Sequence, residues 1–375
     1  MKIRYFDHAA TTPVRDEVIK EMLPYFGIEY GNASVMYSLG RNAKRAIKKA
    51  REQVAYALNA DINEIYFTSC GSESDNLAIK GFAYENKNRG NHIITSKIEH
   101  HAVLDSCKSL EKEGFNVTYL DVDKNGIVDI QELMNSITPK TILISIMYAN
   151  NEIGTIEPIE EIGKIAKQKN IIFHTDAVQA IGNAKIDVKK LNIDMLSLSG
   201  HKFYAPKGVG ALYIRDGIKF RKLQDGGEQE SNMRAGTENV AEIVGLGKAI
   251  ELIYNEFDNY NLKLKELRDY FINSVKNEFD EIKINGDMNK RLSGNANISF
   301  KGINGSELLF KLDNFGICAS AGSACSTSNP EPSNVLTAIG LEKEYLDGTL
   351  RFSFGKDNTK EDVDYLISKL VEIIK

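Results

Sequence analysis

Short apolar runs alternate with longer amphipathic stretches over the middle of the chain, from about residue 64 to residue 214. The runs are rich in β-branched and aromatic residues, whereas the stretches between them place apolar residues at helical spacing. The strand-like runs cover residues 64–69, 92–96, 116–122, 141–149, 171–175, 194–199 and 210–215. Strands separated by helices need crossover connections, so the pattern predicts an α/β fold: a mainly parallel sheet with helices on both faces.

A different pattern follows the last of these runs. A long helical pattern covers about residues 240–279, and two further strand-like runs precede a C-terminal amphipathic helix. A length of 375 residues is typical of two domains. We therefore predict a large domain over residues 15–255 and a smaller α+β domain made of residues 1–14 and 256–375.

The composition is that of an ordinary globular protein. Hydrophobic residues make up 42% and charged residues 26% of the chain, and the net charge is −5. No basic stretch is dense enough to indicate direct nucleic-acid binding. The longest apolar run, residues 141–149, is too short to span a membrane, and residues 1–13 are too polar for a signal peptide. We expect a cytoplasmic protein that binds neither nucleic acid nor a membrane.

The cysteines at positions 70, 107, 318 and 325 are scattered through the chain. Their spacing matches no disulfide framework and no metal-ligand motif, which fits a reducing compartment and predicts no metal site. Cys325 has Ser, Ala, Gly, Thr and Asn as neighbours, followed by Pro330 and Pro332. That composition predicts an exposed, mobile loop over about residues 320–333, whereas a packed thiol normally has apolar neighbours. Taken alone, Cys325 is better explained as a chance cysteine in a turn, and the rest of the chain has to decide.

Residues 121–132 match the calcium-loop pattern of an EF-hand, with a central Gly126 and a final Glu132. A calcium-binding hand needs a helix before the loop, but residues 116–120 alternate like a β-strand. We therefore predict a strand–turn–helix connection, with Asn125 and Gly126 in the turn.

Polar side chains follow several of the predicted strands, at the sheet edge where ligands bind in such folds. Ser72 begins a helix and could either cap it or help to bind a phosphate. Asp176 and Gln179 could form a simple capping box. The other candidates are His100, His101, Asn150, Asn151, Ser199, His201 and Lys202. Each has an ordinary structural explanation by itself, but one cofactor pocket accounts for all of them together.

The chemistry of this set narrows the choice of cofactor. The chain lacks a GxxxxGK[ST] phosphate loop, a GxGxxG fingerprint and a metal cluster. A lysine, a phosphate site and a carboxylate are what pyridoxal phosphate requires. The lysine binds the cofactor covalently, and the carboxylate keeps the pyridine nitrogen protonated so that the ring withdraws electrons. The residue set therefore indicates pyridoxal phosphate.

Several motifs give the chain a more specific likeness. They include YFDHAATTP at residues 5–13, SLSGHKFYAPKGVGALY at 197–213, MRAGTENV at 233–240 and AGSACSTSNPEPS at 321–333. In these motifs the chain resembles a cysteine desulfurase of the class V aminotransferase family, which are pyridoxal-phosphate enzymes of fold type I. The resemblance covers essentially the whole chain. It implies a fold type I transferase with a large domain, whose mainly parallel sheet is flanked by helices, and a smaller α+β domain.

The resemblance also implies roles for residues around the cofactor ring. Lys202 would bind the cofactor covalently, Asp176 would pair with the pyridine nitrogen, and Gln179 would face the ring oxygen. His100 would stack on the ring and relay protons.

Further roles concern the phosphate and the substrate. The phosphate-binding residues implied by the resemblance are Gly71, Ser72, Ser199, His201 and, from the partner subunit of a homodimer, Thr237. Asn151 would contact the cofactor and, together with Arg351, the substrate carboxylate, to which Arg351 would bind through a bidentate pair.

The reaction implied is the removal of sulfur from L-cysteine, which releases L-alanine and leaves a persulfide on Cys325. The sulfur would pass to a protein acceptor, such as an iron–sulfur scaffold or a tRNA-thiolation protein. An ordinary class V aminotransferase or a selenocysteine lyase could use the same pocket, although an aminotransferase has no use for a thiol on a mobile loop. A non-catalytic scaffold is disfavoured because Lys202, Asp176 and Arg351 are retained together.

Some positions depart from the pattern usual in that family. Residues 70–72 read Cys-Gly-Ser instead of Gly-Ala-Thr, which puts a second thiol near the cofactor. Ala33, Tyr37 and Ser231 stand where Pro, His and Arg are frequent. These differences bear on turnover rate and partner contacts rather than on the type of reaction.

Overall fold

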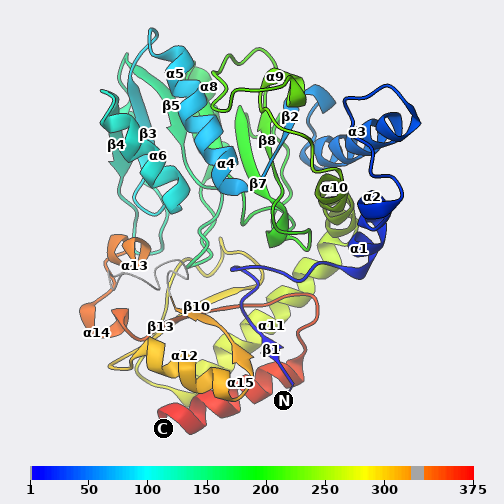
Figure 1. The fold of residues 1–375 in the computed structure, drawn as a ribbon. Helices are drawn as coiled ribbons and strands as arrows, with labels where there is room; N and C mark the ends of the chain where they lie inside the picture. Colours follow the sequence, from blue (N-terminus) through cyan, green and yellow to red (C-terminus); the bar gives the residue numbers. More distant parts are fainter. Residues whose placement is uncertain (1, 322–332) are drawn as a thin grey trace.

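The computed structural model describes residues 2–321 and 333–375, which form two layered units, one above the other in Figure 1. The large unit is built on a seven-stranded sheet and the small unit on a four-stranded sheet. In spatial order, the strands of the larger sheet are β2 (Ile65–Thr68), β8 (Gly210–Ile214), β7 (Met195–Ser199), β6 (Ile172–Asp176), β5 (Thr141–Ser145), β3 (His92–Ser96) and β4 (Asn116–Leu120). Every strand-like run predicted between residues 64 and 215 is a strand of this sheet, and the predicted α/β fold is confirmed.

The larger sheet is parallel from β7 to β4, but β8 runs antiparallel to both β7 and β2. β7 and β8 are joined by residues 200–209, which contain only a turn of 3-10 helix, η3 (Gly200–Lys202). A connection without a crossover helix returns the chain in the antiparallel direction. It therefore keeps Lys202 at the carboxyl end of β7, beside the ends of the parallel strands.

Helices cover both faces of the larger sheet (Figure 1). One face packs against α3 (Ser38–Leu58), α8 (Ile159–Lys169) and α10 (Val240–Asn255), and α1 (Asp16–Met22) packs on α10. The other face is covered by α4 (Gly71–Asn76), the π-helical turn η2 (Leu77–Gly81), α5 (Phe82–Asn86) and α6 (His101–Glu111). Because successive strand residues point to opposite faces, Ile93 joins the second cluster and Ile94 the first.

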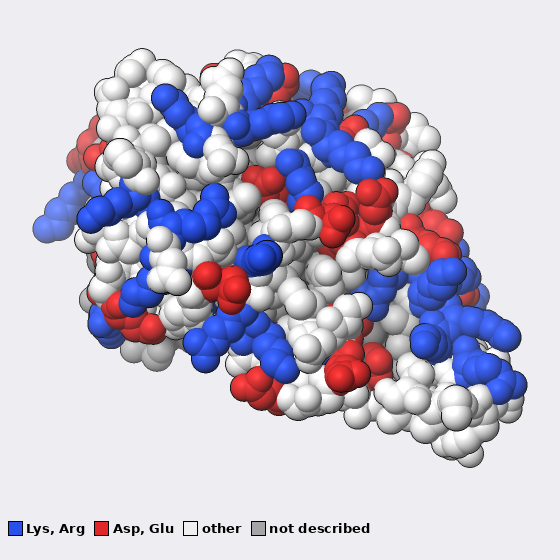
Figure 2. Space-filling model, turned by 90° about the horizontal axis from the view of Figure 1, so that it is seen from above, with Lys and Arg blue, Asp and Glu red and all other residues white. Residues whose placement is uncertain are grey.

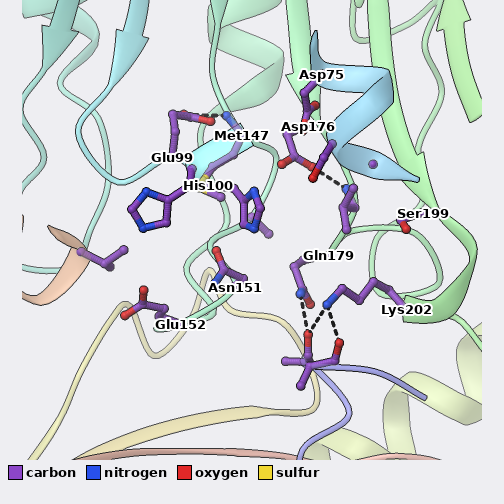
Figure 3. A pocket seen from close by; sticks show the side chains of 18 of the residues that line it. Asp75, Glu99, His100, Met147, Asn151, Glu152, Asp176, Gln179, Ser199 and Lys202 are labelled. Carbon is purple, nitrogen blue, oxygen red and sulfur yellow. Dashed lines mark hydrogen bonds between the residues drawn. The ribbon is translucent and has the colours of Figure 1, made fainter. Parts of the chain in front are cut away.

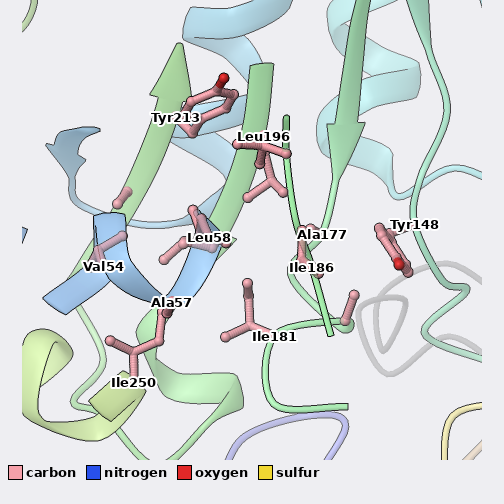
Figure 4. Close-up of a cluster of buried hydrophobic side chains, with 14 of the residues drawn as sticks. Val54, Ala57, Leu58, Tyr148, Ala177, Ile181, Ile186, Leu196, Tyr213 and Ile250 are labelled. Carbon is pink, nitrogen blue, oxygen red and sulfur yellow. The ribbon is translucent and has the colours of Figure 1, made fainter. Parts of the chain in front are cut away.

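The core on the first face is drawn in Figure 4. Val54 and Leu58 of α3 belong to the same cluster as Leu196 and Tyr213 of the sheet, and Ile250 of α10 lies beside Ala57 of α3. Because helices cover both faces of the sheet, β3, β5, β7 and β8 are buried along their whole length, and their polar residues are buried together with the apolar ones.

The small unit has its own hydrophobic core. Its antiparallel strands, in spatial order, are β12 (Ser320–Ala321), β13 (Thr349–Ser353), β10 (Asn295–Phe300) and β9 (Ile282–Ile284). It also contains α11 (Phe257–Glu278), α12 (Gly305–Asn314), α15 (Lys360–Ile374) and the pair β1 (Arg4–Tyr5) with β11 (Ile317–Cys318). The predicted helical pattern 240–279 is divided at Glu256 into α10 and α11. The separate cores support two domains, whose limits stay a prediction.

The segment that resembles a calcium loop is a turn. Asp123 Oδ1 accepts hydrogen bonds from the backbone N–H groups of Asn125 (2.8 Å) and Ile127 (2.9 Å). Asp129 then caps the following helix through Gln131 N–H (2.7 Å). A strand, β4, precedes this turn, so the predicted strand–turn–helix connection is confirmed.

Shorter helices lie between these elements. They are α2 (Pro24–Gly27), α7 (Ile130–Ser136), α9 (Gln229–Asn232), α13 (Asn334–Ala338) and α14 (Lys343–Leu346). Among the described residues, no helix is both long and apolar enough to cross a membrane. On the face seen from above in Figure 2, acidic side chains and uncharged surface interrupt the Lys and Arg side chains. The charge on that face is therefore mixed.

Candidate active site

A cavity of about 460 Å³ lies between the two units, at the carboxyl ends of the parallel strands. Figure 3 shows the side chains around it. The residues predicted from the sequence that line it are Gly71, Ser72, His100, His101, Asn151, Asp176, Gln179, Ser199, His201, Lys202 and Arg351. The fold thus brings residues that lie far apart in the sequence to one place.

Lys202 lies directly after β7, and its side chain extends to the N-terminal segment. Nζ donates hydrogen bonds to the carbonyl oxygens of Ala9 (2.7 Å) and Ala10 (2.7 Å). Gln179 Nε2 also donates to the Ala9 oxygen (3.0 Å), as the dashed lines in Figure 3 show. Sequence reasoning missed Ala9 and Ala10 because they contribute backbone carbonyls, which every residue has. The motif at residues 5–13 was the available signal.

Asp176 ends β6 and is buried in the wall of the cavity. Its Oδ1 accepts a hydrogen bond from the Val178 backbone N–H (2.9 Å), so its carboxylate closes a turn. Burial raises the pKa of Asp176, while His100 and Lys202 oppose this shift. A cation placed beside Asp176 would meet a buried counter-ion, where the attraction is stronger than in water.

His100 is the N-cap residue of α6. Its Nδ1 accepts a hydrogen bond from the Ala102 N–H (3.1 Å), which assigns the proton of the neutral ring to Nε2. Burial is the largest influence on the pKa of His100 and lowers it, so the ring is neutral near pH 7. His100 can therefore offer a neutral aromatic face and one N–H to a bound molecule.

The beginning of α4 forms another end of the cavity. Among the described residues, the side chain of the N-cap residue Cys70 makes no capping hydrogen bond to this helix. A Cβ on Gly71 would lie 2.7 Å from a methyl group of Val178. Burial lowers the pKa of His201 to about 4, and its Nδ1 lies 3.1 Å from Thr11 Oγ1. Together with the Ser72 and Ser199 hydroxyls, this end presents neutral hydrogen-bonding groups of the kind that bind an anion.

Arg351, on β13, is 2% exposed and forms the wall of the cavity that belongs to the small unit. Nη1 donates to the Asn151 carbonyl oxygen (2.9 Å) and Nη2 to Asp7 Oδ1 (2.8 Å). Asp7 Oδ2 in turn accepts a hydrogen bond from Ser320 Oγ (2.7 Å). Within the described residues, the buried Nε of Arg351 has no hydrogen-bond partner. A guanidinium with an unused N–H is suited to a carboxylate ligand.

Sequence reasoning did not assign three further buried carboxyl groups that line the cavity, those of Asp75, Glu99 and Glu152. Glu99 Oε1 accepts a hydrogen bond from the Met147 N–H (2.9 Å), and Glu152 Oε2 accepts one from Ser333 Oγ (2.6 Å). Burial raises the pKa of all three. The sequence carried no signal for them because acidic residues at helix starts and in turns are normally solvated.

Thr237 is a predicted residue that the structure places elsewhere. It lines a separate cavity of about 240 Å³ with Tyr25 and Tyr30, so its contact with the partner subunit's phosphate stays a prediction. Cys325 lies outside the described residues. Cys70 does line the main cavity.

Known proteins are similar to this chain in both sequence and fold. The family model described as Aminotransferase class-V matches residues 4–366. The chain is 56% identical to the cysteine desulfurase IscS of Clostridium botulinum over 373 residues, which cover 99% of this chain and 94% of that protein. The IscS of Methanosarcina thermophila is also 56% identical, with 100% of this chain and 92% of that protein covered. A solved NifS-like protein superposes with a TM-score of 0.94 at 39% identity, covering 100% and 99% of the two chains. The chain therefore belongs to the class V aminotransferase family.

Proposed function

We propose that the protein is a cysteine desulfurase that uses pyridoxal phosphate to remove sulfur from L-cysteine. The observation that carries the proposal is one cavity that combines the Lys202 amine, the buried Asp176 carboxylate and the unused Nε–H of Arg351. The 56% identity to IscS cysteine desulfurases over nearly the whole chain supports the same reaction. In that reaction, L-cysteine and an enzyme thiol become L-alanine and an enzyme persulfide.

The cavity residues fit pyridoxal phosphate. Lys202 supplies an amine for covalent attachment, and Asp176 supplies a buried anion for the pyridine nitrogen. Ser72 and His201 supply neutral groups for the phosphate, beside Gly71, whose close approach to Val178 leaves no room for a Cβ. When bound, the cofactor supplies an electron-withdrawing ring that stabilises negative charge on the carbon skeleton of the substrate.

The chain's own groups orient the substrate and exchange its protons. Arg351 binds the carboxylate of L-cysteine through its free N–H groups, while Asp7 and the Asn151 carbonyl hold the guanidinium in place. The Lys202 amine exchanges a proton at the substrate Cα. His100 holds a second transferable proton on Nε2.

Cys325 accepts the sulfur in this proposal. Its thiolate attacks the substrate sulfur, so that an S–S bond forms while the C–S bond breaks. The electron pair of the broken bond stays with carbon, which takes up a proton to give L-alanine. The persulfide then passes to a protein acceptor, such as an iron–sulfur scaffold or a tRNA-thiolation protein. The proposal includes a cytoplasmic homodimer in which Thr237 completes the phosphate site of the partner subunit.

Mass spectrometry after incubation with L-cysteine tests this function. We expect alanine in solution and one added sulfur on the peptide that contains Cys325. Cys325→Ser should abolish both products. Cys107→Ser is the matched control, because burial raises the pKa of the Cys107 thiol to about 12 and leaves it unreactive.

Other outcomes would change the assignment. Sulfur found on Cys70 would make the cavity thiol the nucleophile. Amino-group transfer from L-cysteine to a 2-oxo acid, without alanine, would identify an aminotransferase. Turnover of selenocysteine but not of cysteine would identify a selenocysteine lyase.

A further inference from the structure

A buried polar layer lies behind Asp176, between the larger sheet and α4. His174 and Asp176 are two positions apart on β6, so their side chains point to the same face of the sheet. Ser197 of β7 is paired in register with Asp176. Asp75 of α4 lies over this row, with its Oδ1 3.7 Å from His174 Nε2, and Figure 3 shows Asp75 next to Asp176 at the cavity wall. Two carboxyl groups and an imidazole thus share a region without solvent.

The imidazole does not neutralise the carboxyl groups. His174 Nδ1 lies 2.8 Å from Ser145 Oγ, and Nε2 lies 3.0 Å from Ser197 Oγ. Complete burial lowers the pKa of His174 to about 3, so the ring is neutral at physiological pH. The groups that influence Asp75 are therefore hydroxyls, a neutral ring, the Cys70 thiol and the carboxyl groups of Asp176 and Glu99.

Neighbouring buried carboxyl groups do not both ionise unless cations balance them. Asp176 is the better stabilised anion, because the Val178 N–H donates to it and Lys202 lies on its cavity side. Asp75 is 1% exposed, and among the described residues its Oδ1 has no hydrogen-bond partner. Burial and the charge of Asp176 raise the pKa of Asp75, and a hydrogen bond between the Asp75 carboxyl group and the Ser197 hydroxyl opposes this shift only in part.

We propose that Asp75 is a positioning residue: a protonated carboxylic acid that donates a hydrogen bond within this layer and leaves the negative charge of the pair on Asp176. The inference rests on the proposed function, in which Asp176 pairs with the ring nitrogen of the cofactor. If Asp75 were ionised, the two carboxylates would compete for one proton. Asp176 would then be protonated part of the time, and it would pair less well with the ring nitrogen.

Infrared difference spectroscopy of the purified enzyme tests the proton directly. At pH 7, Asp75→Asn should remove one carbonyl band of a protonated carboxylic acid. Glu157→Gln is the matched control, because Glu157 is another buried acid with a raised pKa but lies outside the cavity lining. It should lose a band of its own without changing cofactor binding. An Asp75→Asn spectrum with no lost acid band would overturn the proposal.

Cofactor affinity tests the positioning role. Asp75→Asn keeps a neutral donor of the same shape, so its dissociation constant for pyridoxal phosphate and the pH profile of the bound cofactor's absorbance should match wild type. Asp75→Leu removes the donor and should weaken binding about tenfold. Equal losses in both variants would show that a charged Asp75 is needed, and no loss in either would show that Asp75 has no positioning role.

The proposed function and the proposal about Asp75 can be contradicted separately. A wild-type enzyme that binds no pyridoxal phosphate would contradict the proposed function, whereas the infrared band of Asp75 would still be present or absent in the same sample. If Asp75→Leu does not fold, Asp75→Asn still decides the question, because loss of cofactor affinity in that isosteric variant contradicts the neutral form.

Discussion

The two walls of the cavity are built in different ways. On the wall of the large unit, Asp176 is the last residue of β6 and Lys202 lies in the short turn after β7, so the sheet sets the positions of both. On the wall of the small unit, Arg351 is held by Asp7 from the N-terminal segment and by the Asn151 carbonyl from the large unit. The residues of the first wall are positioned by the strand ends next to them in the sequence. Those of the second wall are positioned by contacts that need both units to be folded. We therefore expect changes on the first wall to stop the chemistry and changes on the second to weaken substrate binding.

The largest effect is expected from Lys202→Ala. Without the amine, covalent attachment of the cofactor and proton exchange are both lost, so alanine formation should fall by several orders of magnitude. Lys207→Ala is a matched control on the exposed part of the same loop and should retain activity. If Lys202→Ala formed alanine at the wild-type rate, neither the Lys202 amine nor the large-unit wall that carries it would take part in the chemistry.

The second largest effect on activity is expected from Arg351→Lys. The lysine keeps the positive charge but loses the planar fork, so kcat/KM for L-cysteine should fall about 100-fold, mainly through KM. Steady-state kinetics measures this division. Arg268→Lys controls for the replacement of a buried arginine, because Arg268 is also buried but donates to the Leu292 carbonyl outside the cavity. A fall in kcat alone would mean that the small-unit wall takes part in chemistry.

Asp7→Asn should have a smaller effect on the same wall. The amide still accepts a hydrogen bond from Arg351, but the ion pair that fixes the guanidinium is lost, so KM should rise about tenfold. The absorbance of the bound cofactor should not change, because the other wall is intact. Asp258→Asn removes an exposed ion pair with Lys185 and should be silent. Loss of the cofactor from Asp7→Asn would show that the walls are not independent.

The smallest effect on activity is expected at Glu157, which does not line the cavity and whose pKa is raised by burial from 4.5 to about 8. Below pH 4.5 the folded and unfolded states both hold this proton, and between pH 4.5 and 8 only the folded state holds it. The side chain therefore lowers stability progressively as pH rises through this window, and fully above it.

Urea unfolding of Glu157→Gln measures this contribution. The free energy of unfolding of the variant minus that of wild type should be more positive at pH 8.5 than at pH 4.5, by up to about 5 kcal/mol, so the variant gains stability relative to wild type as the pH rises. Activity should not change. An equal difference between the two proteins at both pH values would mean that Glu157 is ionised in the folded state.

Much of the large-unit wall could be predicted from the sequence. A strand must end before the chain can turn, so Asp176, Ser199 and Lys202 were visible as polar residues directly after apolar runs. Local sequence pattern also identified residues 121–132 as a turn. The alternation of apolar and polar residues in β4 excluded the helix that must precede a calcium-binding loop. The roles of these residues came from the family resemblance, since a helix cap and a phosphate site have the same local pattern.

Periodicity and turn composition are local properties, so they were enough to predict the strands in chain order, the mainly parallel sheet and the residues at its carboxyl edge. The contact between Asp7 and Arg351, which are 344 positions apart, depends on how distant segments of the chain pack. The tertiary structure also decided that Ala9 and Ala10 would face Lys202 and that Asp75 would be buried beside Asp176. These features depend on which surfaces meet and how completely they exclude water. Burial then sets the charge state of a carboxyl group such as that of Asp75 and the orientation of the Arg351 guanidinium.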